Sequence, residues 1–101
     1  MKLQNSFKNE FKNKKILITG GTGSIGIGLI KQLLPYKPKI IKVFTNDENS
    51  IFESMRKFGK NSLVEYEMGD IRDKERLDFV IRGIDIVFHA AAMKHVDICE
   101  D

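Results

Sequence analysis

Apolar and polar residues alternate in blocks along the chain, and the blocks predict four strands separated by three helices. Continuous or alternating apolar runs predict strands at residues 14–20, 40–45, 63–68 and 84–92. Between the first two runs, apolar residues recur at helical spacing over residues 24–36, and Pro35 and Pro38 close that helix. Strands and helices that alternate at this spacing predict parallel strands joined by right-handed crossovers.

The other two helices carry their own start and stop signals. Asp47 is expected to cap the second helix and Gly59 to end it, while Asp73 caps the third helix and Gly83 ends it. An apolar stripe on the second helix is expected in the core, and it consists of Ile51, Phe52, Met55 and Phe58. The third helix is expected to turn its apolar residues inward, namely Leu77, Val80 and Ile81.

The fold class that follows is α/β, a Rossmann-type doubly wound parallel sheet with the strand order 3-2-1-4. The first and fourth strands are continuous apolar runs, which is typical of strands covered on both faces. Apolar and acidic residues alternate from Val64 to Met68, as expected of an edge strand with one wetter face. A ligand crevice is expected beyond the carboxyl ends of strands one and four, where the winding reverses.

A chain of 101 residues forms one domain, and we expect residues 14–101 to form it, preceded by an N-terminal arm at residues 1–13. Phe7 and Phe11 are expected to pack on one side of a short helix in that arm. The mild net charge of +3 gives little support to nucleic-acid binding. No signal peptide or membrane span is visible, and the single cysteine, Cys99, fits a reducing cytoplasm and offers no metal cluster.

The strongest chemical signal is Ile-Leu-Ile-Thr-Gly-Gly-Thr-Gly-Ser-Ile-Gly at residues 16–26, an apolar strand that runs into a glycine-rich turn and a helix. Gly20 can adopt the backbone angles of a tight turn, Gly23 leaves room for a pyrophosphate, and Gly26 is expected to let the helix pack closely on the strand. The helix N-terminus offers unpaired N–H donors to the phosphates. This order of elements predicts a dinucleotide-binding site.

The next two strands also end in candidate binding residues. The second strand ends in Thr45-Asn46-Asp47, where an acidic residue commonly holds the ribose of NAD. Thr45 is neutral and Asp47 can serve as a helix cap instead, so the residues leave NAD and NADP open. The third strand ends in Gly69-Asp70-Ile71, and we expect the Asp70 carboxylate to contact the adenine amino group while Ile71 covers the ring.

The fourth strand ends in His89-Ala90-Ala91-Ala92-Met93-Lys94-His95-Val96. The small side chains of Ala90, Ala91 and Ala92 let a dinucleotide lie close against the strand end. Lys94 places an ammonium group near the crevice, although a lysine here is equally typical of a solvated surface. His89 and His95 are expected to be structural or to support other residues of the site, because the spacing assigns them no carboxylate or serine partner.

Together these segments resemble the extended short-chain dehydrogenase/reductases that modify nucleotide sugars. The Ala-Ala-x-Lys-His-Val run narrows the resemblance to the inverting UDP-N-acetylglucosamine 4,6-dehydratases of the polysaccharide biosynthesis family. In that family a nicotinamide cofactor takes a hydride from C4 of the sugar, the C5 proton and water are lost, and the hydride returns to C6. The product is a 4-keto-6-deoxy sugar nucleotide.

The resemblance implies a role for each matching residue. It places the pyrophosphate on Gly20, Gly23 and Gly26, together with Thr22, Ser24 and Ile25. It assigns the adenine to Asp70 and Ile71, and the ribose side to Ala90, Ala91 and Lys94. It also implies NADP as the favoured cofactor, a UDP-N-acetylglucosamine substrate and a homo-oligomer for the complete enzyme.

Two departures from the family pattern change these expectations. The family often carries an arginine after strand two that binds the 2′-phosphate of NADP, whereas this chain has Thr45 and Asn46. No Tyr-x-x-x-Lys pair occurs in the 101 residues, so the sequence is expected to be the N-terminal part of a larger enzyme, without dehydratase activity alone. The alternatives are part of an NAD-dependent nucleotide-sugar 4-epimerase and a non-catalytic dinucleotide-binding module.

Overall fold

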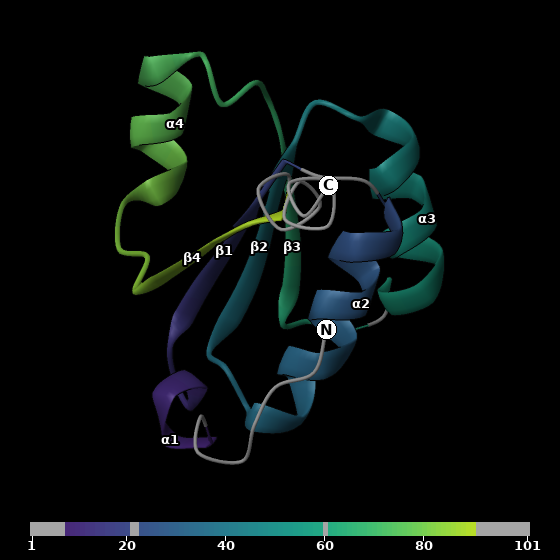
Figure 1. Cartoon of the computed structure of the whole chain (residues 1–101), viewed down its shortest axis with the longest axis vertical. Coiled ribbons are helices and arrows are strands. Elements are labelled where there is room, and N and C mark those ends of the chain that lie inside the picture. Colours follow the sequence, from purple (N-terminus) through teal and green to yellow (C-terminus); the bar gives the residue numbers. More distant parts are fainter. Residues whose placement is uncertain (1–7, 21–22, 60, 91–101) are drawn as a thin grey trace, which may run out of the picture.

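A computed structural model describes residues 8–20, 23–59 and 61–90 of the chain. They contain a parallel sheet of four strands in the order β3-β2-β1-β4, as predicted (Figure 1). The strands are β1 (Lys15–Thr19), β2 (Ile40–Thr45), β3 (Val64–Met68) and β4 (Ile86–His89). The carboxyl ends of all four strands therefore lie along one edge of the sheet.

Helices cover both faces of this sheet (Figure 1). One face carries α2 (Gly23–Leu33), continued by the short 3₁₀ helix η2 (Leu34–Tyr36), and α3 (Glu48–Phe58). The opposite face carries α4 (Lys74–Ile81), and the short helix α1 (Lys8–Phe11) precedes β1. Asp47 and Asp73 cap α3 and α4 with their side chains, which confirms both predicted helix starts.

The central strand β1 divides two cores. Its side chains alternate, so Ile16 and Ile18 enter the larger core with α2, while Leu17 enters a smaller core under α4. Phe44 of β2 and Val80 of α4 complete the smaller core, and both are fully buried. Because β1 pairs with β2 on one side and with β4 on the other, its backbone is also enclosed.

The N-terminal arm belongs to the larger core. Phe11 at the end of α1 is buried, with its ring 5.6 Å from the Tyr36 ring in an edge-to-face arrangement and 6.0 Å from the Phe88 ring. The predicted packing of Phe11 on the domain is therefore confirmed. Phe7 lies outside the described residues.

The apolar stripe predicted on α3 is only partly buried. Ile51 and Phe58 are half-buried, but Phe52 is 59% exposed and Met55 is 47% exposed. The buried position is Ser54, whose hydroxyl lies 2.7 Å from the Tyr66 hydroxyl of β3. The prediction for Phe52 and Met55 was wrong because the sheet contacts only the narrow face that Ile51, Ser54 and Phe58 share, and Phe52 lies about 100° around the helix from Ile51.

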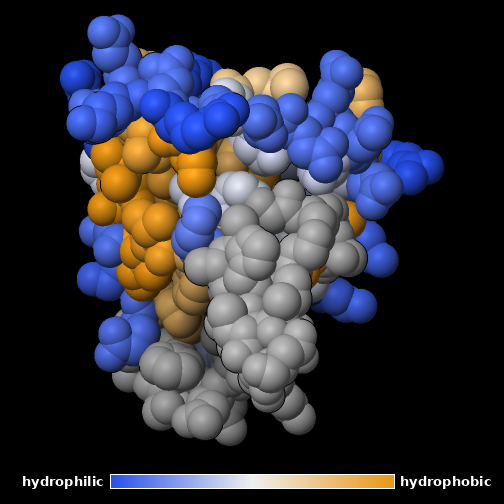
Figure 2. Space-filling view, turned by 45° about the horizontal axis from the view of Figure 1, so that its top comes forward, coloured by the Kyte–Doolittle hydropathy of each residue, from blue (hydrophilic) through white to orange (hydrophobic). Residues whose placement is uncertain are grey.

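A second correction concerns β4 and α4. Val87 of β4 is 47% exposed, so this strand is not covered on both faces, and Ile81 of α4 points into solvent rather than inward. Figure 2 shows a hydrophobic area on the left side of the molecule, where α4 and β4 lie in Figure 1. The described helices leave this area open because only α4 packs on that face of the sheet.

The alternation in β3 is borne out by its place at the edge of the sheet. Val64 is buried in the larger core, whereas the neighbouring Glu65 is exposed on the opposite face. The polarity of this strand therefore follows from having a helix on one face only.

We predict that Phe11→Ala lowers the free energy of unfolding by about 3–5 kcal/mol, because it leaves a cavity between Tyr36 and Phe88. Chemical denaturation monitored by circular dichroism measures the change. The matched control is Phe52→Ala, which removes an exposed ring and is expected to change stability by less than about 0.5 kcal/mol. Equal effects from the two variants would contradict this packing.

Candidate dinucleotide site at the carboxyl edge of the sheet

The turn after β1 has the backbone geometry that a glycine permits. Gly20 has a φ of 64°, and its N–H donates a 3.0 Å hydrogen bond to the carbonyl oxygen of Phe44 in β2. A residue with a Cβ is strained at this φ, so the turn explains a glycine at this position. The chain then enters α2 at Gly23, which places the helix N-terminus at the edge where the strands end.

The first turn of α2 offers main-chain donors. The N–H groups of a helix start have no partner within the helix and carry a partial positive charge. Ile25, in this first turn, packs its side chain against the larger core. Thr22 and the side chain of Ser24 lie outside the described part of the structure.

Gly26 differs from the expectation of close packing between helix and strand. Among the described residues, no atom lies within 4 Å of a Cβ built on Gly26, so no described neighbour requires a glycine there. The close approach in this region occurs instead at Gly69, after β3. A Cβ on Gly69 would come within 2.5 Å of Cε1 of the buried Phe44 ring and 3.0 Å from Cγ of Arg76.

At the end of β2 the side chains are already engaged with the backbone. Thr45 is buried, its Oγ1 accepts a 3.1 Å hydrogen bond from the N–H of Asp47, and its carbonyl accepts from the N–H of Gly69. Asn46 is exposed at the edge of the sheet. Thr45 thus shapes the turn between β2 and α3, and Asn46 is the more accessible of the two predicted contacts.

Asp47 acts as the helix cap, one of the two roles that the sequence left open. Its Oδ1 accepts from the N–H of Asn49 at 3.0 Å, and its Oδ2 accepts from the Ser50 hydroxyl at 2.8 Å. The hydroxyl and backbone hydrogen bonds from Ser50 hold the pKa of Asp47 below its usual value. The carboxylate is therefore ionised and committed to α3.

Asp70 and Arg72 form a compact ion pair just beyond β3. The guanidinium Nη2 lies 2.7 Å from Oδ2, Nε lies 3.1 Å from Oδ1, and the Arg72 N–H donates to Oδ1 at 2.9 Å. The carboxylate of Asp70 is therefore already engaged by the side chain and the backbone N–H of Arg72. Nε also lies 3.2 Å from Oδ2, so Arg72 makes four contacts with a carboxylate that has about four lone-pair sites, and a further donor has to replace one of them.

Arg72 keeps Asp70 negatively charged over a wide pH range. Its side-chain hydrogen bonds, and then its backbone N–H, lower the pKa of Asp70 to about 2. Ile71 between them is 37% exposed, so its side chain is accessible at this edge. A permanent acceptor beside an accessible apolar side chain suits a purine ring that carries an amino group.

The end of β4 provides a contact that the sequence analysis missed. Thr19 and His89 are paired across β1 and β4, and Thr19 Oγ1 lies 2.8 Å from Nδ1 of His89. His89 is thus structural, as expected, and its partner is a hydroxyl of the adjacent strand. Thr19 and His89 are each the last residue of their strand. An alignment of the two apolar stretches of sequence at these ends would therefore have predicted the pair.

Ala90 is buried directly after β4. The remaining predicted contacts, Ala91, Ala92 and Lys94, lie outside the described residues, as does His95. Over the part of the chain that the structure describes, no cluster of three or more potential metal ligands occurs. In the same ranges no helix has the length and apolar character needed to cross a membrane.

The strand order 3-2-1-4 and the helices on both faces define a Rossmann-type α/β domain. Residues 16–101 match the family described as "Polysaccharide biosynthesis protein", and the chain belongs to this family. The match includes the glycine-rich turn and, of the described sheet, every strand residue except Lys15.

Individual relatives agree with the family assignment. The chain is 50% identical over 91 residues to a UDP-N-acetylglucosamine 4,6-dehydratase (inverting) of Campylobacter jejuni, covering 89% of this chain and 27% of the relative. It is 39% identical over 94 residues to a UDP-glucose 4-epimerase of Rickettsia prowazekii, with the same two coverages. The X-ray structure of Pen from Bacillus thuringiensis superposes with a TM-score of 0.74 at 43% identity, over 89% of this chain and 28% of that one. The chain thus spans about a quarter of the length of these relatives.

We predict that the Asp70 carboxyl titrates at about 2 in the folded protein and that Arg72→Gln moves its pKa toward the ordinary value of 3.8. A lowered folded-state pKa means that the ionised group stabilises the fold above about pH 4 and that this contribution is lost as the pH falls toward 2. Carbon-detected NMR titration of the Asp side chains measures both values. Lys74→Gln, which removes an exposed cation from α4, is the control. An Asp70 pKa of 3.8 in the wild type would refute the ion pair.

Proposed function

We propose that the carboxyl edge of this sheet binds NAD(P) and that the chain is the cofactor-binding part of a nucleotide-sugar 4,6-dehydratase. The observation that carries the proposal is the turn at Gly20, whose positive φ brings the start of α2 to the ends of the strands. Membership of the polysaccharide biosynthesis family supports it. The coarser statement, a nucleotide-sugar dehydratase or epimerase, fits the names of both groups of relatives.

The residues of this edge fit a dinucleotide. We assign the pyrophosphate to the backbone from Gly20 through Thr22, Gly23, Ser24 and Ile25 to Gly26, because N–H groups of a helix start bind anions. Asp70 is 32% exposed and accepts from the adenine amino group in exchange for one contact with the exposed Arg72, and Ile71 covers the ring. Asn46 is the candidate for the adenosine ribose, with Thr45 holding its turn in place.

On the nicotinamide side we assign Ala90, Ala91, Ala92 and Lys94, which follow β4 in the sequence. Small side chains admit the cofactor close to the strand end, and an ammonium group can donate to a ribose hydroxyl or a phosphate. When bound, the cofactor supplies reversible hydride transfer. The described residues supply binding, orientation and a fixed negative charge at Asp70.

We further propose that these 101 residues do not convert a sugar nucleotide by themselves. They contain no Tyr-x-x-x-Lys pair, so no acid/base couple of that kind is available beside the cofactor. The 4-epimerase is the second candidate, and the 39% identical relative favours it. The 50% identity to the dehydratase supports our choice of the dehydratase as the first candidate.

We predict that the chain binds NADPH or NADH with a single saturable isotherm and that Gly23→Trp weakens binding by at least about tenfold, because an indole fills the space beside the helix start. Isothermal titration calorimetry with each cofactor measures this effect and determines whether the absent arginine after β2 costs NADP affinity. Ser62→Trp adds the same ring to an exposed turn before β3 and should leave binding unchanged. Equal affinities for wild type and Gly23→Trp would refute the site.

The sugar chemistry is tested by a chimera. Residues 1–101 replace the matching segment of the Campylobacter jejuni dehydratase, and NMR follows UDP-N-acetylglucosamine. We expect the chimera to form the 4-keto-6-deoxy product and its Gly23→Trp version to form none. A parallel chimera with the Rickettsia prowazekii epimerase separates the candidates. A dehydratase chimera that binds cofactor but forms no product, beside an active epimerase chimera, would favour epimerisation.

A further inference from the structure

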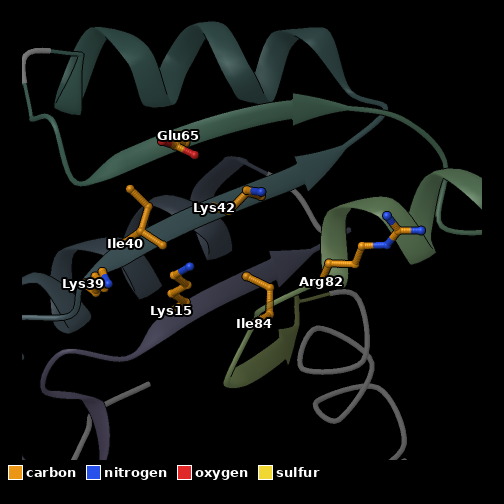
Figure 3. A pocket seen from close by; sticks show the side chains of 7 residues that line it. All are labelled: Lys15, Lys39, Ile40, Lys42, Glu65, Arg82 and Ile84. Carbon is orange, nitrogen blue, oxygen red and sulfur yellow. The ribbon is translucent and has the colours of Figure 1, made fainter.

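A pocket of about 260 Å³ opens on the α4 face of the sheet, at the end opposite to the candidate dinucleotide site (Figure 3). Three lysines line it, namely Lys15 at the start of β1, Lys39 just before β2 and Lys42 within β2. Arg82, directly after α4, also lines it, and in Figure 3 its guanidinium points away from Lys15 and Lys42. Four cationic side chains thus line the pocket, with Ile40 and Ile84 as apolar lining.

The positive charge of this pocket is poorly compensated. Glu65 of β3 is the only carboxylate among its lining residues. The two ion pairs formed among the described side chains join Arg72 to Asp70 and Arg76 to Glu67, so none of the four pocket cations takes part in one. Asp85, next to the pocket, uses its Oδ2 to accept the backbone N–H of Lys15 at 2.8 Å.

The excess of three positive charges equals the formal net charge of +3 of the whole chain, so the rest of the chain is neutral. A concave site lined by one sign of charge concentrates counter-ions, since field lines focus there. Two of the lysines also occupy strand positions on the sheet face that α4 covers, where apolar residues are expected. Lys15 and Lys42 are both half-buried at such positions.

We propose that this pocket binds a small polyanion with two or more phosphate charges, at a site separate from the cofactor edge. Its volume exceeds the size of a single phosphate and is close to the lower limit of about 300 Å³ for small-molecule sites. Lysine and arginine side chains are the usual partners of phosphate oxygens. A nucleic acid is disfavoured because the formal charges outside the pocket sum to zero, whereas nucleic-acid-binding domains usually carry a basic excess.

The test is a titration of the ¹⁵N-labelled 101-residue chain with inorganic pyrophosphate, followed by amide NMR shifts at constant ionic strength. The residue-resolved shifts separate the two sites, because pyrophosphate can also bind at the helix start near Gly23. We expect saturable shifts at Lys15, Lys42 and Ile84. The shifts at the pocket should persist in Gly23→Trp, whereas the shifts around the glycine-rich turn should disappear. The result at the pocket therefore holds even if the proposed cofactor site fails its own test.

Variants that remove a positive charge and a variant that removes a negative charge should change the affinity in opposite directions. A folding defect would weaken binding in all of them. Lys42→Gln and Arg82→Gln should each weaken binding at the pocket by about three- to tenfold, whereas Glu65→Gln should tighten it by about threefold. Lys57→Gln removes a cation from α3, on the other face of the sheet, and should have no effect. All four variants are expected to keep the wild-type circular dichroism spectrum.

Three outcomes would overturn the proposal. The first is a set of shifts confined to the turn after β1. The second is a set of pocket shifts that does not saturate and is matched by sodium chloride, which is the behaviour of an unspecific ion atmosphere. The third is tighter binding of single-stranded oligonucleotides than of pyrophosphate at the same residues, which would assign the pocket to a macromolecule.

Discussion

The structure depends on the burial of β1 between β2 and β4. Every residue from Ile16 to Thr19 is buried, and the strand supplies side chains to the larger core on one face and to the smaller core on the other. Both neighbours of β1 run parallel to it, which requires crossover connections rather than tight hairpins. All carboxyl ends then fall on one edge, and the glycine-rich turn that follows β1 is fixed at the middle of that edge.

The two faces of the sheet are covered to different extents, and this difference determines the rest of the surface. α2 and α3, together with Phe11 from α1, cover the first face and form the larger core. α4 alone covers the second face, where Leu17, Phe44 and Val80 form a small core. The uncovered remainder of this face carries the exposed Val87 of β4 and the cationic pocket near the amino ends of β1 and β2.

Some polar groups at the carboxyl edge are accessible to a ligand, and others already form hydrogen bonds within the protein. Thr45, Asp47 and His89 are engaged in the turns and strand ends that surround the site. The start of α2 and the partly exposed carboxylate of Asp70 are what the described part of the edge offers to a ligand. Arg72 both restrains Asp70 and keeps it charged, so the same ion pair positions the acceptor and fixes its protonation state.

The sequence by itself determined the order and type of the elements, the strand order 3-2-1-4, both Asp caps and the glycine turn, because these depend on local periodicity, on backbone freedom and on the handedness of crossovers. Only the tertiary structure decided which apolar residues are covered. Phe52, Met55, Ile81 and Val87 are apolar at periodic positions, yet they are exposed because no described element packs on them. It also decided the partners of Asp70 and His89, and it brought Lys15, Lys42 and Arg82 into one pocket, since contacts between residues distant in sequence exist only once the strands are in register.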